Sequence, residues 1–151
     1  LLCGGGLLMD RLTHLYRQII LDHYKNPRNK GLKDDASYHT VHLKNPTCGD
    51  DITIAVKREG DTILDVRHEG SGCSICCSSA SVLATLMQNT DVSHAKTLIT
   101  HYHAMLHGEA FDEALLKEAA AYQGVKQFPA RYKCATIAWQ AFESALKEEG
   151  E

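Results

Sequence analysis

The segment DITIAVKREGDTILDVRHE, residues 51–69, is the strongest indication of the fold class. Apolar and polar side chains alternate on both sides of Glu59-Gly60-Asp61, which is the period-two pattern of β-strands that have one apolar face. The glycine-containing turn predicts that residues 51–58 and 62–69 pair as an antiparallel hairpin. Residues 38–43 form a further strand candidate upstream. We therefore expect a three-stranded antiparallel meander with helices over one face.

Helical periodicity flanks this hairpin on both sides. Apolar residues from Leu12 to Ile20 recur every three or four positions, so a first amphipathic helix is expected to start at Asp10, its cap, and to stop near Pro27. The same spacing predicts further helices over residues 73–88, 92–106, 111–122 and 132–146. The predicted fold class is α+β: a single domain with a three-stranded antiparallel sheet packed against about five helices.

The bulk composition limits the classes of partner. The chain has 151 residues, with 44% hydrophobic and 23% charged residues, which is typical of one globular domain. The formal net charge is -3 and the basic residues are spread along the chain, so no nucleic-acid partner is expected. No apolar run approaches the roughly 20 residues that a membrane-spanning helix needs, so no membrane partner is expected either.

The first residues, Leu1 to Leu8, lack the basic region of a secretory signal and precede Met9. We expect residues 1–9 to be an upstream extension or a cloning remnant, and residues 10–151 to be the functional domain. The chain contains 6 cysteines and shows no export signal, so its thiols are expected to stay reduced, in the cytoplasm, for metal or sulfur chemistry.

Two cysteines are predicted in turns at the ends of the hairpin, where ligating or reactive thiols are common. Cys48 and Asp50 lie in the turn before the hairpin, and Asn45-Pro46-Thr47 is expected to hold them off the sheet. Cys73 follows a glycine hinge at a predicted helix start, where backbone N–H groups and the helix dipole stabilise a thiolate. The thiols of Cys48 and Cys73 are therefore candidates for metal binding or for nucleophilic reactions.

A third such thiol is predicted in the first turn of the last helix. Cys134 lies there beside Arg131 and Lys133, whose positive charges also favour a thiolate. Three thiolates and one carboxylate form a ligand set that tetrahedral zinc accepts, and the softness of sulfur also suits an iron-sulfur cluster. Spacing alone does not choose between the two, and the four groups meet only if the fold brings them together. The set consists of Cys48, Asp50, Cys73 and Cys134.

The other two cysteines of the predicted helix 73–88 are interpreted as structural. Cys76 and Cys77 fall among small residues and are expected to be small buried hydrophobes. Cys73 and Cys76 also form a C-x-x-C motif at a helix start. A thioredoxin-like function is not favoured, because an antiparallel hairpin precedes the motif where a βαβ unit would be required.

The histidines do not predict a separate metal site. His103 and His107 are four residues apart on one predicted helix, with His101 nearby, and such a pair is sterically able to bind zinc. That helix offers no obvious third ligand. We therefore expect these residues to be partly exposed helix positions.

The sequence contains three ordered motifs: NPTCGD at residues 45–50, GSGCSI at residues 70–75 and RYKC at residues 131–134. Together they resemble the U-type proteins of iron-sulfur cluster assembly, the IscU and SufU family. The segment DHYKNPRN at residues 22–29 is similar to the first helix of this family and its exit. The resemblance runs from about Met9 to Leu146 and is highly specific.

Two features resemble the SufU branch of the family. Lys133 stands where IscU proteins commonly have a histidine, and a helical insertion is expected between the second and third motifs. The resemblance implies a three-stranded antiparallel sheet on helices, in agreement with the periodicity, and a sulfur relay from a SufS-like pyridoxal-phosphate cysteine desulfurase to the iron-sulfur assembly machinery. Cys76 and Cys77 depart from the family, which usually has small residues or methionine there. The zinc ligands that it implies are Cys48, Asp50, Cys73 and Cys134.

The expected function is therefore that of a zinc-dependent sulfurtransferase. Cys48 is expected to accept the persulfide sulfur, with Asp50 as a labile ligand and with Cys73 and Cys134 as anchors. Arg131 is assigned to the catalytic site, where it orients a partner or stabilises the thiolate of Cys134; the alternative is a solvated loop charge. Two other functions stay open: a scaffold on which an iron-sulfur cluster is built and transferred, and a structural zinc module.

Overall fold

The predicted hairpin forms the centre of the sheet in the computed structural model, which describes residues 2–46 and 49–150. Strand β2 (Asp50–Glu59) pairs with β3 (Thr62–Ser71) in antiparallel register, and Gly60 takes a left-handed φ of 59° in the turn between them. Glycine adopts this conformation at no steric cost, so the turn is encoded locally. The hairpin prediction is confirmed.

The sheet has four strands in the described residues, in the order β1-β2-β3-β4. Strand β1 (Tyr38–Asn45) pairs with β2, and β4 (Thr90–Asp91) pairs with β3. The α+β class is confirmed, but the expected three-stranded sheet is wrong by one strand. Strand β4 has only 2 residues, too few to show an alternating pattern, and it is held by contacts such as the hydrogen bond that Asn89 N donates to Ile63 O at 2.7 Å.

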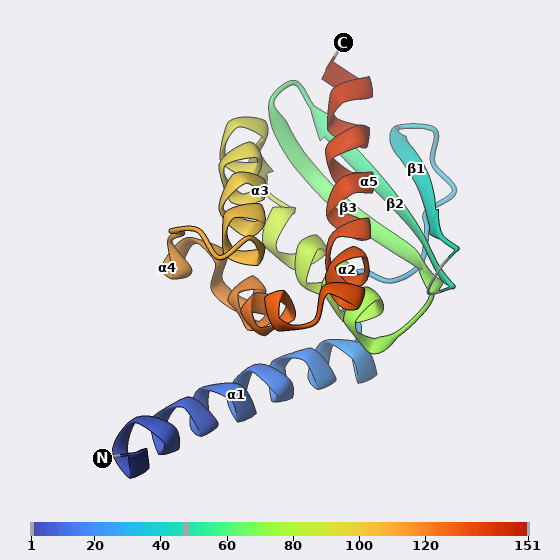
Figure 1. Cartoon of the computed structure of the whole chain (residues 1–151). Helices are drawn as coiled ribbons and strands as arrows, with labels where there is room; N and C mark the ends of the chain where they lie inside the picture. Colours follow the sequence, from blue (N-terminus) through green and yellow to red (C-terminus); the bar gives the residue numbers. More distant parts are fainter. Residues whose placement is uncertain (1, 47–48, 151) are drawn as a thin grey trace.

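Five α-helices and two 3₁₀ segments are described beside this sheet (Figure 1). Helix α3 has the bounds that the periodicity predicted. In the part of the chain that is described, no helix is both long and apolar enough to cross a membrane. The helices are α1 (Leu2–Lys25), α2 (Ser74–Met87), α3 (Val92–Leu106), α4 (Glu113–Leu116) and α5 (Tyr132–Gly150), and the 3₁₀ segments are η1 (Lys117–Gln127) and η2 (Pro129–Arg131).

Helix α1 starts earlier than expected. Its first residue is Leu2, so the predicted cap at Asp10 is wrong. No proline lies between these two positions, and a helix that has nucleated gains a backbone hydrogen bond for each residue it adds. The expected division between residues 1–9 and 10–151 falls inside this helix and stays a prediction.

The single helix expected over residues 111–122 is also wrong, because α4 and η1 replace it. The Asp112 side chain caps α4 by accepting hydrogen bonds from the backbone of Ala114 and Leu115, and Lys117 follows α4 with a positive φ of 51°. A positive φ lies outside the right-handed helical region, so the α-helix ends at Lys117 and the chain continues as the 3₁₀ segment η1. The apolar residues 119–122 of this segment are all buried, although the helical period is broken.

Helices α5 and α2 lie over the sheet and supply many of the core residues (Figure 1). Helix α5 contacts β1 and β2, whereas α2 contacts β3. Alternate residues of β2, namely Ile52, Ile54 and Val56, are buried together with Trp139 and Phe142 of α5. Burial of each such side chain contributes roughly 1.5–3 kcal/mol. This packing sets the position of α5 relative to the hairpin.

Helix α1 packs against α2 and η1, and a buried histidine joins the three elements. The His23 side chain is 1% exposed. Its Nδ1 lies 2.7 Å from Ser81 Oγ on α2, and its Nε2 lies 2.9 Å from Glu118 Oε1 on η1. A buried polar group whose partners are all present favours one orientation of the elements that carry it.

Candidate metal centre

Three of the four predicted ligands lie together. Asp50 is the first residue of β2, Cys73 is the N-cap of α2, and Cys134 lies in the first turn of α5. One ligand atom from each residue lies within 4.8 Å of the other two. The ends of three elements that are distant in sequence therefore meet at one point. Cys48, the fourth predicted ligand, lies outside the described residues.

The carboxylate of Asp50 has an unusual environment for a charged group. Asp50 is 1% exposed, Cys134 is fully buried, and Cys73 is half-buried. Asp50 Oδ1 accepts a hydrogen bond from Cys73 N at 3.2 Å, but its buried Oδ2 has no hydrogen-bond partner among the described residues. A buried carboxylate oxygen is costly unless a cation or a donor compensates it.

The donors present fit a zinc ion. Two thiol sulfurs and one carboxylate oxygen are of the types that zinc binds, and a positive charge would compensate the buried Oδ2 of Asp50. Cys73 also lies at the positive end of the α2 dipole, which stabilises a negative charge there. The arrangement suits a cation held by thiolates and one carboxylate.

Glycines allow the backbone to approach closely at this site. A Cβ atom on Gly72 would lie 2.5 Å from Asp50 Oδ1, and a Cβ atom on Gly70 would lie 2.0 Å from the backbone oxygen of Asp51. Both distances are below any contact that a real Cβ makes. The GSG sequence before Cys73 therefore permits the carboxylate to reach the thiol.

Arg131 and Lys133 are both exposed beside the start of α5. Arg131, the last residue of η2, lines a groove of about 440 Å³ together with Ser74 and Ile75, which directly follow the predicted ligand Cys73. The groove is also lined by apolar side chains from α1 and η1, and by Phe128, the residue between η1 and η2, which is 61% exposed. Arg131 thus lies on a partly apolar surface that adjoins the predicted ligands.

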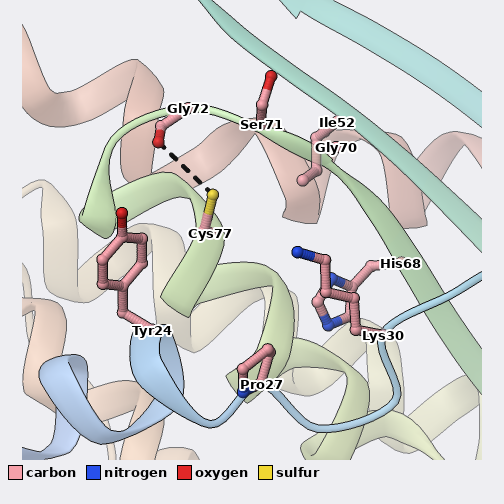
Figure 2. A pocket seen from close by; sticks show the side chains of 9 residues that line it. All are labelled: Tyr24, Pro27, Lys30, Ile52, His68, Gly70, Ser71, Gly72 and Cys77. Atoms are coloured by element: carbon pink, nitrogen blue, oxygen red, sulfur yellow. Dashed lines mark hydrogen bonds between the residues drawn. The ribbon is translucent and has the colours of Figure 1, made fainter.

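The two additional cysteines of α2 differ in their surroundings. Cys76 is fully buried, which confirms the interpretation as a small hydrophobe. The same interpretation is wrong for Cys77, which is partly exposed and lines a cleft of about 220 Å³ with Tyr24, Lys30 and His68 (Figure 2). Neighbouring positions on a helix point in directions about 100° apart, so one thiol faces the core and the other the cleft.

The Cys77 thiol is polarised by its surroundings. It donates a hydrogen bond to the Gly72 carbonyl at 3.7 Å, as the dashed line in Figure 2 shows. A hydrogen bond from the Cys76 thiol, with a smaller effect of the Lys30 charge, lowers the pKa of Cys77 to about 7. The same hydrogen bond and burial raise the pKa of Cys76. Because Cys76 is buried, the C-x-x-C motif does not present two accessible thiols.

His101 of α3 and its C-cap residue His107 form side-chain hydrogen bonds. His101 Nδ1 accepts from Asp112 N at 3.0 Å, and His107 Nε2 lies 3.0 Å from the Tyr132 hydroxyl. Among the described residues, the cluster around Asp50 is the one group of three or more ligating side chains that are close enough to share an ion.

Sequence reasoning missed Asn45 as a residue of the site. The strand predicted to end at Leu43 continues to Asn45, which is 5% exposed and pairs with Asp50 across β1 and β2. Its side-chain Nδ2 is buried without a hydrogen-bond partner among the described residues. The signal was present in the alternation, since Asn45 is two residues beyond Leu43 and hence on the same strand face.

The chain is similar to known proteins along most of its length. Residues 15–135 match the family model of the NifU-like N terminal domain. The chain is 45% identical over 141 residues to the zinc-dependent sulfurtransferase SufU of Bacillus subtilis (strain 168), with 92% of this chain and 95% of that protein covered. It is 35% identical over 142 residues to the iron-sulfur cluster assembly scaffold protein IscU of Streptococcus pyogenes serotype M1, with 93% and 88% covered.

Solved structures share the fold. A candidate iron-sulfur cluster assembly scaffold protein for the SUF system from Fervidobacterium islandicum AW-1 superposes with a TM-score of 0.77 at 30% identity, over 85% of this chain and 93% of that chain. The crystal structure of a hypothetical protein gives a TM-score of 0.82 at 36% identity, over 89% and 98% of the two chains. The shared fold includes most of the chain described above.

Proposed function

Because the chain belongs to the NifU-like N-terminal domain family, we propose that it is a zinc-dependent sulfurtransferase that relays sulfur for iron-sulfur cluster assembly. The donor is a pyridoxal-phosphate cysteine desulfurase, and the acceptors are the assembly machinery of the cytoplasm. Residues 10–151 form the functional domain. The observation that carries the proposal is the convergence of Asp50, Cys73 and Cys134 within 4.8 Å.

The zinc ligands in this proposal are the three clustered residues and Cys48. Asp50 Oδ2, which is buried without a partner among the described residues, supports a cation at this point. Zinc, when bound, neutralises the buried negative charge and keeps its cysteine ligands as thiolates. Cys73 and Cys134, at the starts of two helices, hold the site in place.

The sulfur-transfer step uses Cys48 as the nucleophile. The Cys48 thiolate attacks the terminal sulfur of the desulfurase persulfide, so that a new S–S bond forms on Cys48 while the S–S bond of the donor breaks. The donor cysteine leaves as a thiolate, and no electrons are gained or lost overall. Arg131, exposed on the groove beside Cys73, orients the partner or stabilises the Cys134 thiolate.

A desulfurase assay tests this proposal. Turnover of the desulfurase with cysteine is measured with and without the wild-type chain, and zinc content is measured on the same samples. We expect stimulation by the wild type, loss of stimulation for Cys48→Ala, and full stimulation for Cys77→Ser, a matched thiol outside the ligand set. If Cys48→Ala binds zinc and stimulates turnover as the wild type does, the chain is a structural zinc module and the relay is wrong.

A second candidate function is the assembly of an iron-sulfur cluster on the same ligands, followed by its transfer. The similarity to a protein named as an IscU scaffold favours it. Purification without oxygen separates the two functions. A brown iron-containing protein supports the scaffold, whereas a colourless protein with one zinc per chain supports the relay.

A further inference from the structure

We propose that the side-chain amide of Asn45 donates a hydrogen bond to a metal-bound cysteine sulfur of the zinc site. Asn45 would thereby be a positioning residue that lowers the electron density on that sulfur. This inference rests on the proposed zinc site and adds a residue that acts on its ligands. It is carried by the register of β1 and β2 and by two buried atoms that have no hydrogen-bond partner within residues 2–46 and 49–150.

The register places Asn45 beside a proposed ligand. Asn45, the last residue of β1, pairs with Asp50, the first residue of β2. Directly opposite residues of an antiparallel pair project to the same face, with Cβ atoms about 4.5–5.5 Å apart. The preceding pair on this face, Leu43 with Ile52, packs into the core. On this face of β1 and β2, apolar cross-strand pairs are therefore followed by one polar pair, Asn45 with Asp50, next to the proposed zinc site.

Each member of this polar pair carries one unsatisfied atom. Asn45 Nδ2 is a donor and Asp50 Oδ2 is an acceptor, and both are buried with no hydrogen-bond partner among the described residues. The two residues are neighbours, yet they do not bond to each other. Burial of an unpaired amide costs about 1–3 kcal/mol, so a partner for the amide is expected in the functional state.

One bound ion with thiolate ligands satisfies both atoms. The cation compensates Asp50 Oδ2, and a thiolate on that cation offers the acceptor that Asn45 Nδ2 lacks. The other carboxylate oxygen, Oδ1, already accepts from Cys73 N, so it is a weaker candidate for the amide. An N–H donor withdraws charge from sulfur, which stabilises the bound thiolate and makes it a weaker electron donor to the metal.

The direct test uses wild-type chain labelled with ¹⁵N and loaded with ¹¹³Cd²⁺. A hydrogen bond to a cadmium-bound sulfur transmits a scalar coupling from ¹¹³Cd to the amide proton. We expect this coupling on one side-chain amide, and its disappearance in Asn45→Leu, which keeps the branched shape without a donor. Absence of any ¹¹³Cd coupling to the Asn45 amide in the wild type overturns the proposal.

Substitution with Co²⁺ tests the consequence for the ligand. Removal of the donor should shift the sulfur-to-cobalt charge-transfer band to longer wavelength in both Asn45→Leu and Asn45→Asp. Zinc affinity, measured by competition with a chelator, should fall by about 10-fold or more. Asn29→Asp is the matched control, because its amide bonds Val66 O and Gln88 Oε1 away from the ligands. It should leave the band unmoved.

The outcomes separate this inference from the proposed function. If the wild type binds no stoichiometric zinc or cadmium, the proposed function is wrong and the inference falls with it. If the wild type binds one ion and the charge-transfer band stays in place in both Asn45 variants, only the role of Asn45 is wrong. A purely structural role would lower the thermal stability of the variants and leave the band position unchanged.

Discussion

Gly72 lies between the end of β3 and the N-cap of α2, at the point where the backbone passes the carboxylate of Asp50. The absence of a side chain there lets Asp50 Oδ1 accept the hydrogen bond from Cys73 N. At the scale of single residues, the site therefore depends on glycines that leave room for the carboxylate as well as on the predicted ligands. Single residues also respond to their surroundings through their pKa values. Burial lowers the pKa of His68, and a hydrogen bond from Cys76 lowers the pKa of Cys77.

Gly72→Ala should weaken zinc binding. The added Cβ would lie 2.5 Å from Asp50 Oδ1, so the carboxylate must move away from the thiols. We expect a loss of zinc affinity of about 10-fold or more, measured by competition with a chelator. Gly124→Ala is the control, because a Cβ there has no atom within 4 Å among the described residues. Equal zinc affinities for the two variants would contradict the steric explanation.

His68→Gln should make the free energy of unfolding less dependent on pH in the acidic range. Burial, aided by the Lys30 charge, lowers the pKa of His68 below its ordinary value of 6.5, although a hydrogen bond to Arg28 O opposes this. The unfolded chain then binds the proton at higher pH than the folded chain, so stability is full above about pH 6.5 and falls as the pH drops through the lowered pKa. The measurement is the free energy of unfolding from about pH 7 to pH 5.

The control for this prediction is His94→Gln, at an exposed position of α3. It should keep the slope of the wild type. If the wild type and His68→Gln lose the same stability between these pH values, the buried imidazole does not cause the acid sensitivity.

At the scale of elements, the predicted ligands lie at the ends of helices and strands, whereas the middle parts of these elements supply the buried core residues. Helix α1 lies outside the sheet and is held in place by its contacts with α2 and η1. The link runs through His23, whose two ring nitrogens reach Ser81 and Glu118. Ser81 Oγ also accepts from Arg28 N at 2.8 Å, which fixes the chain as it leaves α1.

His23→Ala should loosen α1. The substitution leaves the Ser81 hydroxyl with one partner fewer and creates a cavity, at a cost of about 1–3 kcal/mol in the free energy of unfolding. Hydrogen exchange should show faster opening of α1, and chemical denaturation gives the overall loss. His14→Ala, at an exposed position of the same helix, should change the unfolding free energy by less than about 0.5 kcal/mol. Unchanged exchange in α1 for His23→Ala would exclude this histidine as the link.

At the scale of the whole molecule, the candidate metal centre joins three parts of the fold. It connects the start of the hairpin at Asp50, the junction of β3 and α2 at Cys73, and the start of α5 at Cys134. These segments are separated by up to 84 positions in sequence (134 − 50). An ion bound here would act as a cross-link between the sheet and the two helices that cover it.

Removal of zinc should therefore destabilise the whole domain. Ligand binding at 100 times the dissociation constant stabilises a folded protein by about 2.7 kcal/mol, and for a chain of this size that corresponds to roughly 5–10 °C in Tm. We expect Tm to fall by this order after treatment with a chelator and to recover when zinc is restored. Cys73→Ser should show little response to either treatment. If the Tm of the wild type is the same with and without zinc, the ion has no stabilising role.

Local sequence patterns were sufficient to predict the hairpin and most of the helices, and the motifs were sufficient to propose a set of metal ligands. The hairpin and α3 follow from short-range periodicity, and the proposed ligands were predicted from the NPTCGD, GSGCSI and RYKC motifs and their family resemblance. Periodicity did not predict the extension of α1 to Leu2, the 3₁₀ path of η1 or the two residues of β4. Each of these depends on chain propagation or on contacts with distant elements, which leave no local pattern.

Which side chains meet and which are buried depends on the tertiary structure. It brings Asp50, Cys73 and Cys134 within 4.8 Å and turns Cys77 toward a cleft. It also buries Asn45 beside Asp50, with a side-chain amide that has no partner in the described part of the chain. Local sequence controls backbone conformation over a few residues. The meeting of segments far apart in sequence depends on the packing of α2 and α5 over the sheet, and that packing is a property of the complete core.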